Sequence, residues 1–169
     1  MEKYFKFIDS INDFIGRYVS YLFVPLVFML IFEVVARYIF NRPTQWNYDF
    51  TANLMGYYVF LGAGFTYLNK GFINMDAVYT RLSERKKAIF DICSFPLGLI
   101  FLTLLVWAGG QQAKQSLSIL ETSGPPVYFP IYPLKTFLFV GSILLWLQFV
   151  TDILRKLQFV LNKKQGGGK

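Results

Sequence analysis

The sequence predicts an all-α integral membrane protein with four transmembrane helices, cytoplasmic N- and C-termini, and short amphipathic helices at the membrane interface. Hydrophobic residues make up 54% of the chain and aromatic residues 20%, and lipid solvates such side chains where water would not. Four apolar spans each approach the ~20 residues that cross a bilayer as a helix. These spans are Tyr18–Tyr38, Phe50–Leu68, Ile92–Gly110 and Leu134–Ile153.

The distribution of positive charge orients the spans. Of the 17 lysine and arginine residues, all but four lie on one side, in the N-terminal segment, the second connection and the C-terminal tail. Positively charged loops stay in the cytoplasm, so this side is predicted to be cytoplasmic. The exceptions on the external side are Arg37, Arg42, Lys114 and Lys135.

Three regions are expected along the chain. Residues 1–16 are predicted to form an amphipathic helix in the cytoplasmic interface, because apolar residues recur there at three- and four-residue steps. A second interpretation stays open, in which this segment extends the first span into water. Residues 17–155 form the four-helix transmembrane domain, and residues 156–169 form a basic tail whose glycine-rich end is expected to be disordered.

The connections carry their own signals. Pro43 ends the first helix, and Trp46 suits the headgroup level, where tryptophan is enriched. On the cytoplasmic side, Asp76–Leu82 is predicted to be a brief amphipathic helix, with Ser83 as the N-cap of a long third helix. Helix-compatible residues continue to Leu120, so the third helix should project beyond the bilayer into a proline-rich external loop.

Basic residues at the start of the third helix are candidates for lipid contact. Arg85, Lys86 and Lys87 are expected to meet phosphates of the anionic inner leaflet, although a solvated charge run would explain them as well. The basic residues collect beside span ends, so the net charge of +7 is assigned to phospholipid partners and not to nucleic acid.

Glu33 and Arg37 are the clearest candidate functional charges, because a charge within a span is costly unless it is paired. Being four residues apart, they can pair on one helix face. One interpretation makes this pair structural, and the other makes Glu33 a proton or cation carrier.

In the second span, the small residues Ala52, Gly56 and Gly64 permit close helix packing, either within this unit or with a partner.

Several kinds of site are not expected. The single cysteine, Cys93, excludes an internal disulfide and a cysteine metal cluster, and the lack of histidine excludes bis-histidine haem and most zinc sites. The sequence has no nucleotide-binding loop or nucleophile motif, and polar residues such as Gln148 are scattered singly in the spans. We therefore expect a scaffold with no enzymatic activity, metal or cofactor.

The chain resembles the small, DctQ-type membrane subunit of tripartite ATP-independent periplasmic (TRAP) transporters. The resemblance rests first on the run from Glu33 to Pro43, followed by Trp46 and Asp49. It continues through residues 60–64, 74–76, 121–126 and 132–135, and so covers nearly the whole chain.

The resemblance implies a small subunit that assembles with a large elevator-type membrane subunit, which holds the sodium and substrate sites. It also implies docking of a periplasmic substrate-binding protein, uptake of organic acids, and location in a bacterial or archaeal inner membrane. By this resemblance, Arg37, Asn41, Trp46 and Asp49 organise the external end of the first hairpin, and Glu33 and Arg37 face the large subunit. The alternatives are a self-sufficient proton-coupled exporter that uses Glu33 and an anchor for a redox enzyme, which the lack of histidine disfavours.

Overall fold

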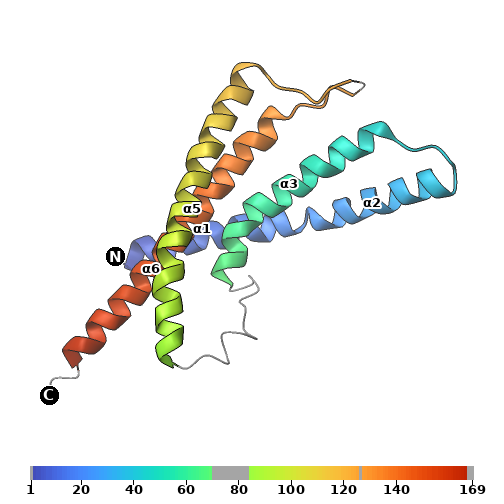
Figure 1. Ribbon diagram of the computed structural model, residues 1–169. Helices are drawn as coiled ribbons and strands as arrows, with labels where there is room; N and C mark the ends of the chain where they lie inside the picture. Colours follow the sequence, from blue (N-terminus) through green and yellow to red (C-terminus); the bar gives the residue numbers. More distant parts are fainter. Residues whose placement is uncertain (1, 70–83, 126, 167–169) are drawn as a thin grey trace.

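The computed structural model describes residues 2–69, 84–125 and 127–166 (Figure 1). Its helices are α1 (Glu2–Ser20), α2 (Phe23–Tyr38), α3 (Gln45–Leu68), α5 (Glu84–Ser118) and α6 (Tyr132–Gly166). An isolated antiparallel bridge joins Thr122 to Pro130 in the loop between α5 and α6. The predicted all-α class is confirmed for these described residues.

Polar side chains lie inside the packed helices, and large apolar side chains cover the outside. The largest fully buried side chains are Gln148, Asn12, Asn47, Thr151, Ser116 and Ser142. Phe28 on α2 and Trp107 on α5, by contrast, are about two-thirds exposed. A water-soluble domain shows the opposite distribution, so this surface is one that lipid solvates.

Three segments are long and apolar enough to cross a membrane: Lys3–Tyr38, Phe95–Ser118 and Tyr132–Arg155. Their most apolar stretches have mean hydropathies of 2.3, 1.3 and 1.9, respectively. The chain is therefore a multi-pass membrane protein. α3 covers the predicted second span but is not among these three segments, and it contains polar residues such as Asn53. The fourth crossing and the orientation of the termini remain predictions.

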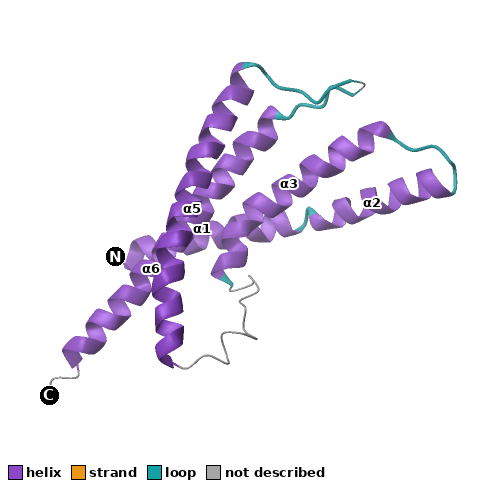
Figure 2. Ribbon diagram, viewed as in Figure 1, coloured by secondary structure: helices purple, strands orange, loops and turns teal. Residues whose placement is uncertain are grey.

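The first predicted span is not one continuous helix, because a turn at Tyr21 and Leu22 separates α1 from α2 (Figure 2). Pro25 lies four residues after Tyr21, so the Tyr21 carbonyl loses its helical N–H donor. The chain tightens there, and the Val24 N–H donates instead to the Tyr21 carbonyl at 3.2 Å. As a result, the N-terminal helix extends to Ser20, whereas the sequence interpretation placed a boundary after residue 16.

α1 and α2 run in the same general direction, and α3, α5 and α6 then alternate, so that α3 and α6 run parallel to each other (Figure 1). Both loops, residues 39–44 and 119–131, lie at one end of the molecule, here called the loop end, and the chain termini lie toward the other, the terminal end (Figure 1). The α2–α3 and α5–α6 hairpins diverge toward the loop end. Side-chain contacts agree with these directions. The antiparallel pairs meet at Phe23–Tyr58 and Phe32–Trp46 for α2 and α3, and at Phe95–Phe149 and Thr103–Trp146 for α5 and α6. The parallel pair α3 and α6 meets at Tyr57–Phe137 and Tyr67–Phe149.

Glycines allow α3 to pack closely against its neighbours. A Cβ atom at Gly141 of α6 would lie 2.3 Å from the Phe60 carbonyl oxygen of α3. Another at Gly16 of α1 would lie 2.1 Å from the Phe65 side chain of α3. Close backbone approach through small residues is the usual basis of helix association in lipid, and it makes α3 the central helix of the described structure.

The long third helix was predicted closely, since α5 begins at Glu84 and ends at Ser118. Its 35 residues span about 52 Å, which exceeds a hydrocarbon core. The predicted amphipathic helix Asp76–Leu82 and the predicted cap Ser83 lie outside the described residues. α6 continues to Gly166, well past the predicted span Leu134–Ile153.

Candidate functional site

The Glu33 carboxylate joins α2 to α3 at the loop end. The Arg37 guanidinium donates to Glu33 Oε1 at 2.8 Å, as the spacing of the two residues predicted. Glu33 Oε2 accepts from the Thr44 hydroxyl and from Asn47 Nδ2, the latter at 3.3 Å. We call these four residues the Glu33 cluster. Because its donors come from α2, the loop and α3, the cluster fixes the geometry of the first hairpin.

Asn47 is the buried member of the Glu33 cluster. Its side chain is only 1% exposed, and its amide nitrogen also donates to the Met29 carbonyl at 3.1 Å. A proton carrier has to exchange its partners during every cycle, whereas both Glu33 oxygens here accept hydrogen bonds from fixed neighbours. This arrangement favours the structural interpretation of Glu33 and Arg37 over the carrier interpretation.

The turn after α2 positions Asn41 and Trp46, two further residues predicted for the first hairpin. Asn41 has a φ of 49°, a left-handed conformation that asparagine tolerates better than most residues. The chain can therefore reverse, and the Arg42 N–H donates to the Ala36 carbonyl at 2.9 Å. Trp46 then packs against Phe32, with ring centroids 6.2 Å apart, while it remains partly exposed.

Asp49 connects the start of α3 to the second loop. The Ser123 hydroxyl donates to Asp49 Oδ2 at 3.0 Å and accepts from the Phe129 N–H at 2.8 Å. The Phe129 ring also meets the Phe50 ring edge-on, with centroids 6.1 Å apart. The loop between α5 and α6 is thus held against α3, and the two hairpins are linked at the loop end.

A second ion pair lies where α6 begins. Lys135 Nζ is 2.6 Å from Glu121 Oε2 and lowers the pKa of the Glu121 carboxyl below its ordinary value of 4.5. The preceding turn ends α5: Leu120 has a φ of 46°, and the Glu121 N–H donates to the Ser116 carbonyl at 3.0 Å. These contacts tie Glu121, in the loop that the sequence predicts to be proline-rich, to the ends of α5 and α6.

A polar network that the sequence interpretation missed joins α1 to α6 near the terminal end. Asn12 Nδ2 donates to Gln148 Oε1 at 2.8 Å, and Gln148 Nε2 donates to Asp9 Oδ1 at 2.9 Å. Arg155 forms an ion pair with the other oxygen of Asp9. We call these four residues the Asp9 network. Gln148 was expected to stand alone, and that expectation was wrong, because its partners come from a helix more than a hundred residues earlier.

The sequence did contain a signal for this network. Asn12 interrupts the apolar face of α1 that also carries Phe5 and Val19, and Gln148 is a polar residue within an apolar span. Polar side chains on such faces need partners when they are buried, and both are at most 2% exposed. Pairing the unpartnered polar residues of different spans would have suggested this contact.

Of the small residues predicted on α3, two contact other helices of the same chain. A Cβ atom at Gly56 would lie 2.5 Å from a methyl group of Leu134, and one at Gly64 would lie 2.0 Å from Asn12 Oδ1. Ala52 is exposed. Internal packing therefore accounts for Gly56 and Gly64, and Ala52 is the one of the three that lies open to a partner or to lipid.

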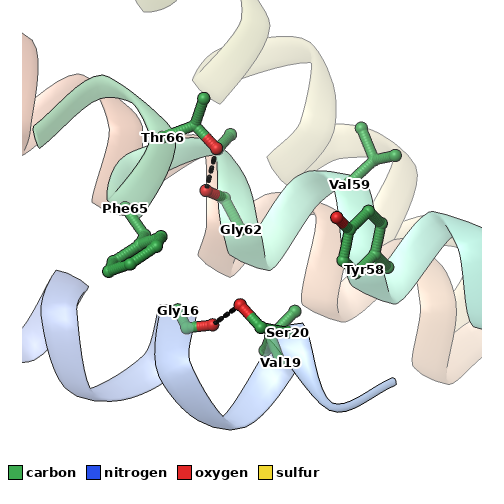
Figure 3. Close-up of a pocket in the computed structure, with 9 residues that line it drawn as sticks. Gly16, Val19, Ser20, Tyr58, Val59, Gly62, Phe65 and Thr66 are labelled. Carbon is green, nitrogen blue, oxygen red and sulfur yellow. Dashed lines mark hydrogen bonds between the residues drawn. The ribbon is translucent and has the colours of Figure 1, made fainter. Parts of the chain in front are cut away.

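A groove of about 310 Å³ lies between α1 and α3, next to the break at Tyr21 (Figure 3). Two of the hydroxyl groups on its walls are bonded within their own helices: Ser20 donates to the Gly16 carbonyl at 2.7 Å, and Thr66 to the Gly62 carbonyl at 3.0 Å. The groove therefore offers mainly apolar surface, and it does not resemble an ion site.

The remaining predictions concern lipid and metal. Arg85, Lys86 and Lys87 lie in the first turns of α5, but their side chains are outside what the structure describes, so their lipid contact remains a prediction. Within the described residues, no three histidine, cysteine, aspartate or glutamate side chains are grouped to hold a metal ion.

Comparison with known families identifies the chain over most of its length. Residues 26–159 match the family model described as tripartite ATP-independent periplasmic transporters, DctQ component. No curated protein matches the chain. The match begins within α2 and includes the Glu33 cluster, the second loop and most of α6.

Proposed function

The chain belongs to the DctQ component family of tripartite ATP-independent periplasmic transporters, and from this membership we propose that it is the small scaffold subunit of a sodium-coupled importer of organic acids. Membership makes the chain a transporter component and not an enzyme. The family match over residues 26–159 is the observation that carries the proposal.

The proposed partners are a large elevator-type membrane subunit and, at the loop end, a periplasmic substrate-binding protein. The rigidity of the loop end supports this assignment, because the Glu33 cluster and the Asp49–Ser123 bond hold both loops in place. A scaffold has to keep its shape while a moving subunit slides against it. In this proposal the loop end faces the periplasm, and the terminal end lies in the cytoplasm of a bacterium or archaeon.

The residues proposed at the partner interface play two different parts. Arg37, Trp46 and Ala52 are exposed and available for direct contact. Glu33, Asn41 and Asp49 order the surface on which contact occurs, through the bonds and the turn described above. Gly56 and Gly64 contribute by setting the spacing of α3 from its neighbours.

Affinity purification of the chain from its native membrane in mild detergent, followed by mass spectrometry, tests the proposal. We expect a large, many-span membrane protein in roughly equal amount. Deleting the chain should then abolish organic-acid uptake while the large subunit remains in the membrane. Recovery of the chain alone, or normal uptake in the deletion strain, would contradict the scaffold role.

The alternative of a self-sufficient proton-coupled exporter makes an opposite prediction. In that case, purified chain in vesicles would transport by itself, and Glu33→Gln would abolish the transport. We expect vesicles that contain only this chain to show no proton-driven flux with either residue at position 33. Measuring the internal pH of such vesicles decides between the two functions.

A further inference from the structure

The sequence of α1 places three different faces around one helix. At 3.6 residues per turn, each face occupies about a third of the circumference. The first face packs against α3 and α6 and carries the buried residues Phe5, Asn12, Gly16 and Val19. The Asp9 network lies beside this face, so it fixes the rotation of α1 relative to α6.

The second face is an aromatic stripe that the rest of the described chain leaves uncovered. Its members follow one another at steps of three, four and seven residues, and their exposed fractions range from 62% to 75%. They are Tyr4, Phe7, Phe14, Tyr18 and Tyr21. The rings of Phe14 and Tyr18 also contact each other, with centroids 4.6 Å apart.

The third face is polar and adjoins the aromatic stripe. It carries Lys3, Lys6, Ser10, Asp13 and Arg17. Asp13 and Arg17 neutralise each other at 2.9 Å, whereas Lys3 and Lys6 form no ion pair with any of the residues that the structure describes. A hollow of about 440 Å³ follows the border between the two faces, from Ser10 to Tyr21.

We propose that the aromatic stripe of α1 is embedded in the lipid leaflet at the terminal end, at the boundary between headgroups and acyl chains, and that anionic phospholipid is its partner. Tyrosine suits this depth because its apolar ring and its hydroxyl group meet different solvents there, and the phenylalanine rings add apolar surface for the acyl chains. The positive charges of Lys3 and Lys6 complement anionic headgroups on the neighbouring face.

Two structural features favour lipid over a protein partner as the occupant of the stripe. The stripe leads directly into α2, whose exposed phenylalanines continue an apolar surface within the single membrane candidate Lys3–Tyr38. The stripe also borders a charged face along its whole length, which is typical of helices at a lipid–water interface.

Site-directed spin labelling of the full chain tests the proposal. With Cys93→Ser as background, single cysteines at adjacent positions give matched pairs: Phe7→Cys against Lys6→Cys, and Phe14→Cys against Asp13→Cys. Each labelled protein is placed in vesicles of phosphatidylglycerol and phosphatidylethanolamine. Collision rates with oxygen, which concentrates in lipid, and with a neutral nickel chelate, which stays in water, are then measured.

We expect oxygen-to-nickel collision ratios several-fold higher at positions 7 and 14 than at positions 6 and 13. Raising the phosphatidylglycerol fraction should increase the ratio at position 7, and Lys3→Gln with Lys6→Gln should remove that increase. Nickel-dominated collisions along the stripe would overturn the proposal in favour of a helix in water. If neither reagent reaches the stripe in the complex purified from native membranes, the proposal is overturned in favour of a protein partner. A collision ratio that does not change with the phosphatidylglycerol fraction would exclude anionic lipid as the partner.

Discussion

Asn47 lies between α2 and α3 and donates to two acceptors on α2, the Glu33 carboxylate and the Met29 carbonyl. The sequence interpretation found Glu33 and Arg37 from their spacing on one helix. It did not find Thr44 or Asn47, because these donors reach Glu33 only after the chain has reversed at Asn41. Local pairs can be predicted from helix periodicity, whereas partners across a turn depend on the geometry of that turn.

We predict that Asn47→Ala destabilises the protein by about 1–2 kcal/mol, since it removes two interhelical hydrogen bonds in lipid-solvated surroundings. Unfolding by dodecyl sulfate in mixed micelles measures this change. Asn53→Ala is the matched control, because Asn53 is also buried on α3 but its amide nitrogen donates to its own helix, at the Asp49 carbonyl. Equal losses in the two variants would mean that Asn47 does not join the helices.

The Glu121–Lys135 pair predicts a dependence of stability on pH. The pKa of Glu121 is lowered in the folded state by the Lys135 ammonium, so folding favours the ionised carboxyl. The stabilisation is therefore complete above about pH 4.5, and it disappears as the pH falls through the lowered pKa. The effect should be small, since both side chains are partly exposed.

Thermal melting in detergent between about pH 7 and pH 3 measures that dependence. Native protein should melt at a slightly higher temperature than Glu121→Gln at neutral pH, and the two curves should converge in acid. A difference that grows toward low pH would show that the ion pair is not the source of the stabilisation.

At the scale of elements, apolar length and turn residues located the long helices but not the break between α1 and α2. The run around Pro25 is apolar enough to predict one continuous span. A proline inside a helix removes one donor and crowds the preceding turn, and here the chain tightens at Tyr21 in response. The hydropathy of a span predicts its length and does not predict its continuity.

Close packing of α3 against α6 predicts different costs for two glycine substitutions. Gly141→Ala should destabilise the protein by about 1–3 kcal/mol, because the new methyl group would overlap the Phe60 carbonyl and force the helices apart. Gly109→Ala should be neutral or slightly stabilising, since the nearest atom is at an ordinary 3.5 Å and alanine favours the helix. Both variants are compared by dodecyl sulfate unfolding, and a neutral Gly141→Ala would contradict the packing of α3 on α6.

At the scale of the molecule, the Asp9 network fastens the first helix to the last. The sequence predicted an amphipathic N-terminal segment, but pairing Asp9 and Asn12 with Gln148 and Arg155 requires the arrangement of helices that lie far apart in the chain. Span hydropathy and charge asymmetry predict how many spans cross the membrane and in which direction each span runs. They contain little information about which helices are neighbours.

We predict that Asp9→Ala loosens α1 from α6, because it removes an ion pair and a hydrogen bond to a buried amide, together worth about 1–2 kcal/mol. Amide hydrogen exchange within α1 should become faster in this variant. Asp13→Ala is the control: its partner, Arg17, lies on α1 itself, and the helix gains the same alanine. Comparable exchange in the two variants would mean that the network does not hold α1.

In the order of their contacts, the described helices run from α5 through α6 and α3 to α2. They form a layer that is mostly one helix thick, and α1 crosses this layer near the terminal end. This layer has two broad sides, and the described helices do not enclose a channel. In the proposed function, the large membrane subunit supplies the opposite wall of the path that the solute takes. Because the arrangement is mostly one helix thick, each of these helices has surface on both broad sides.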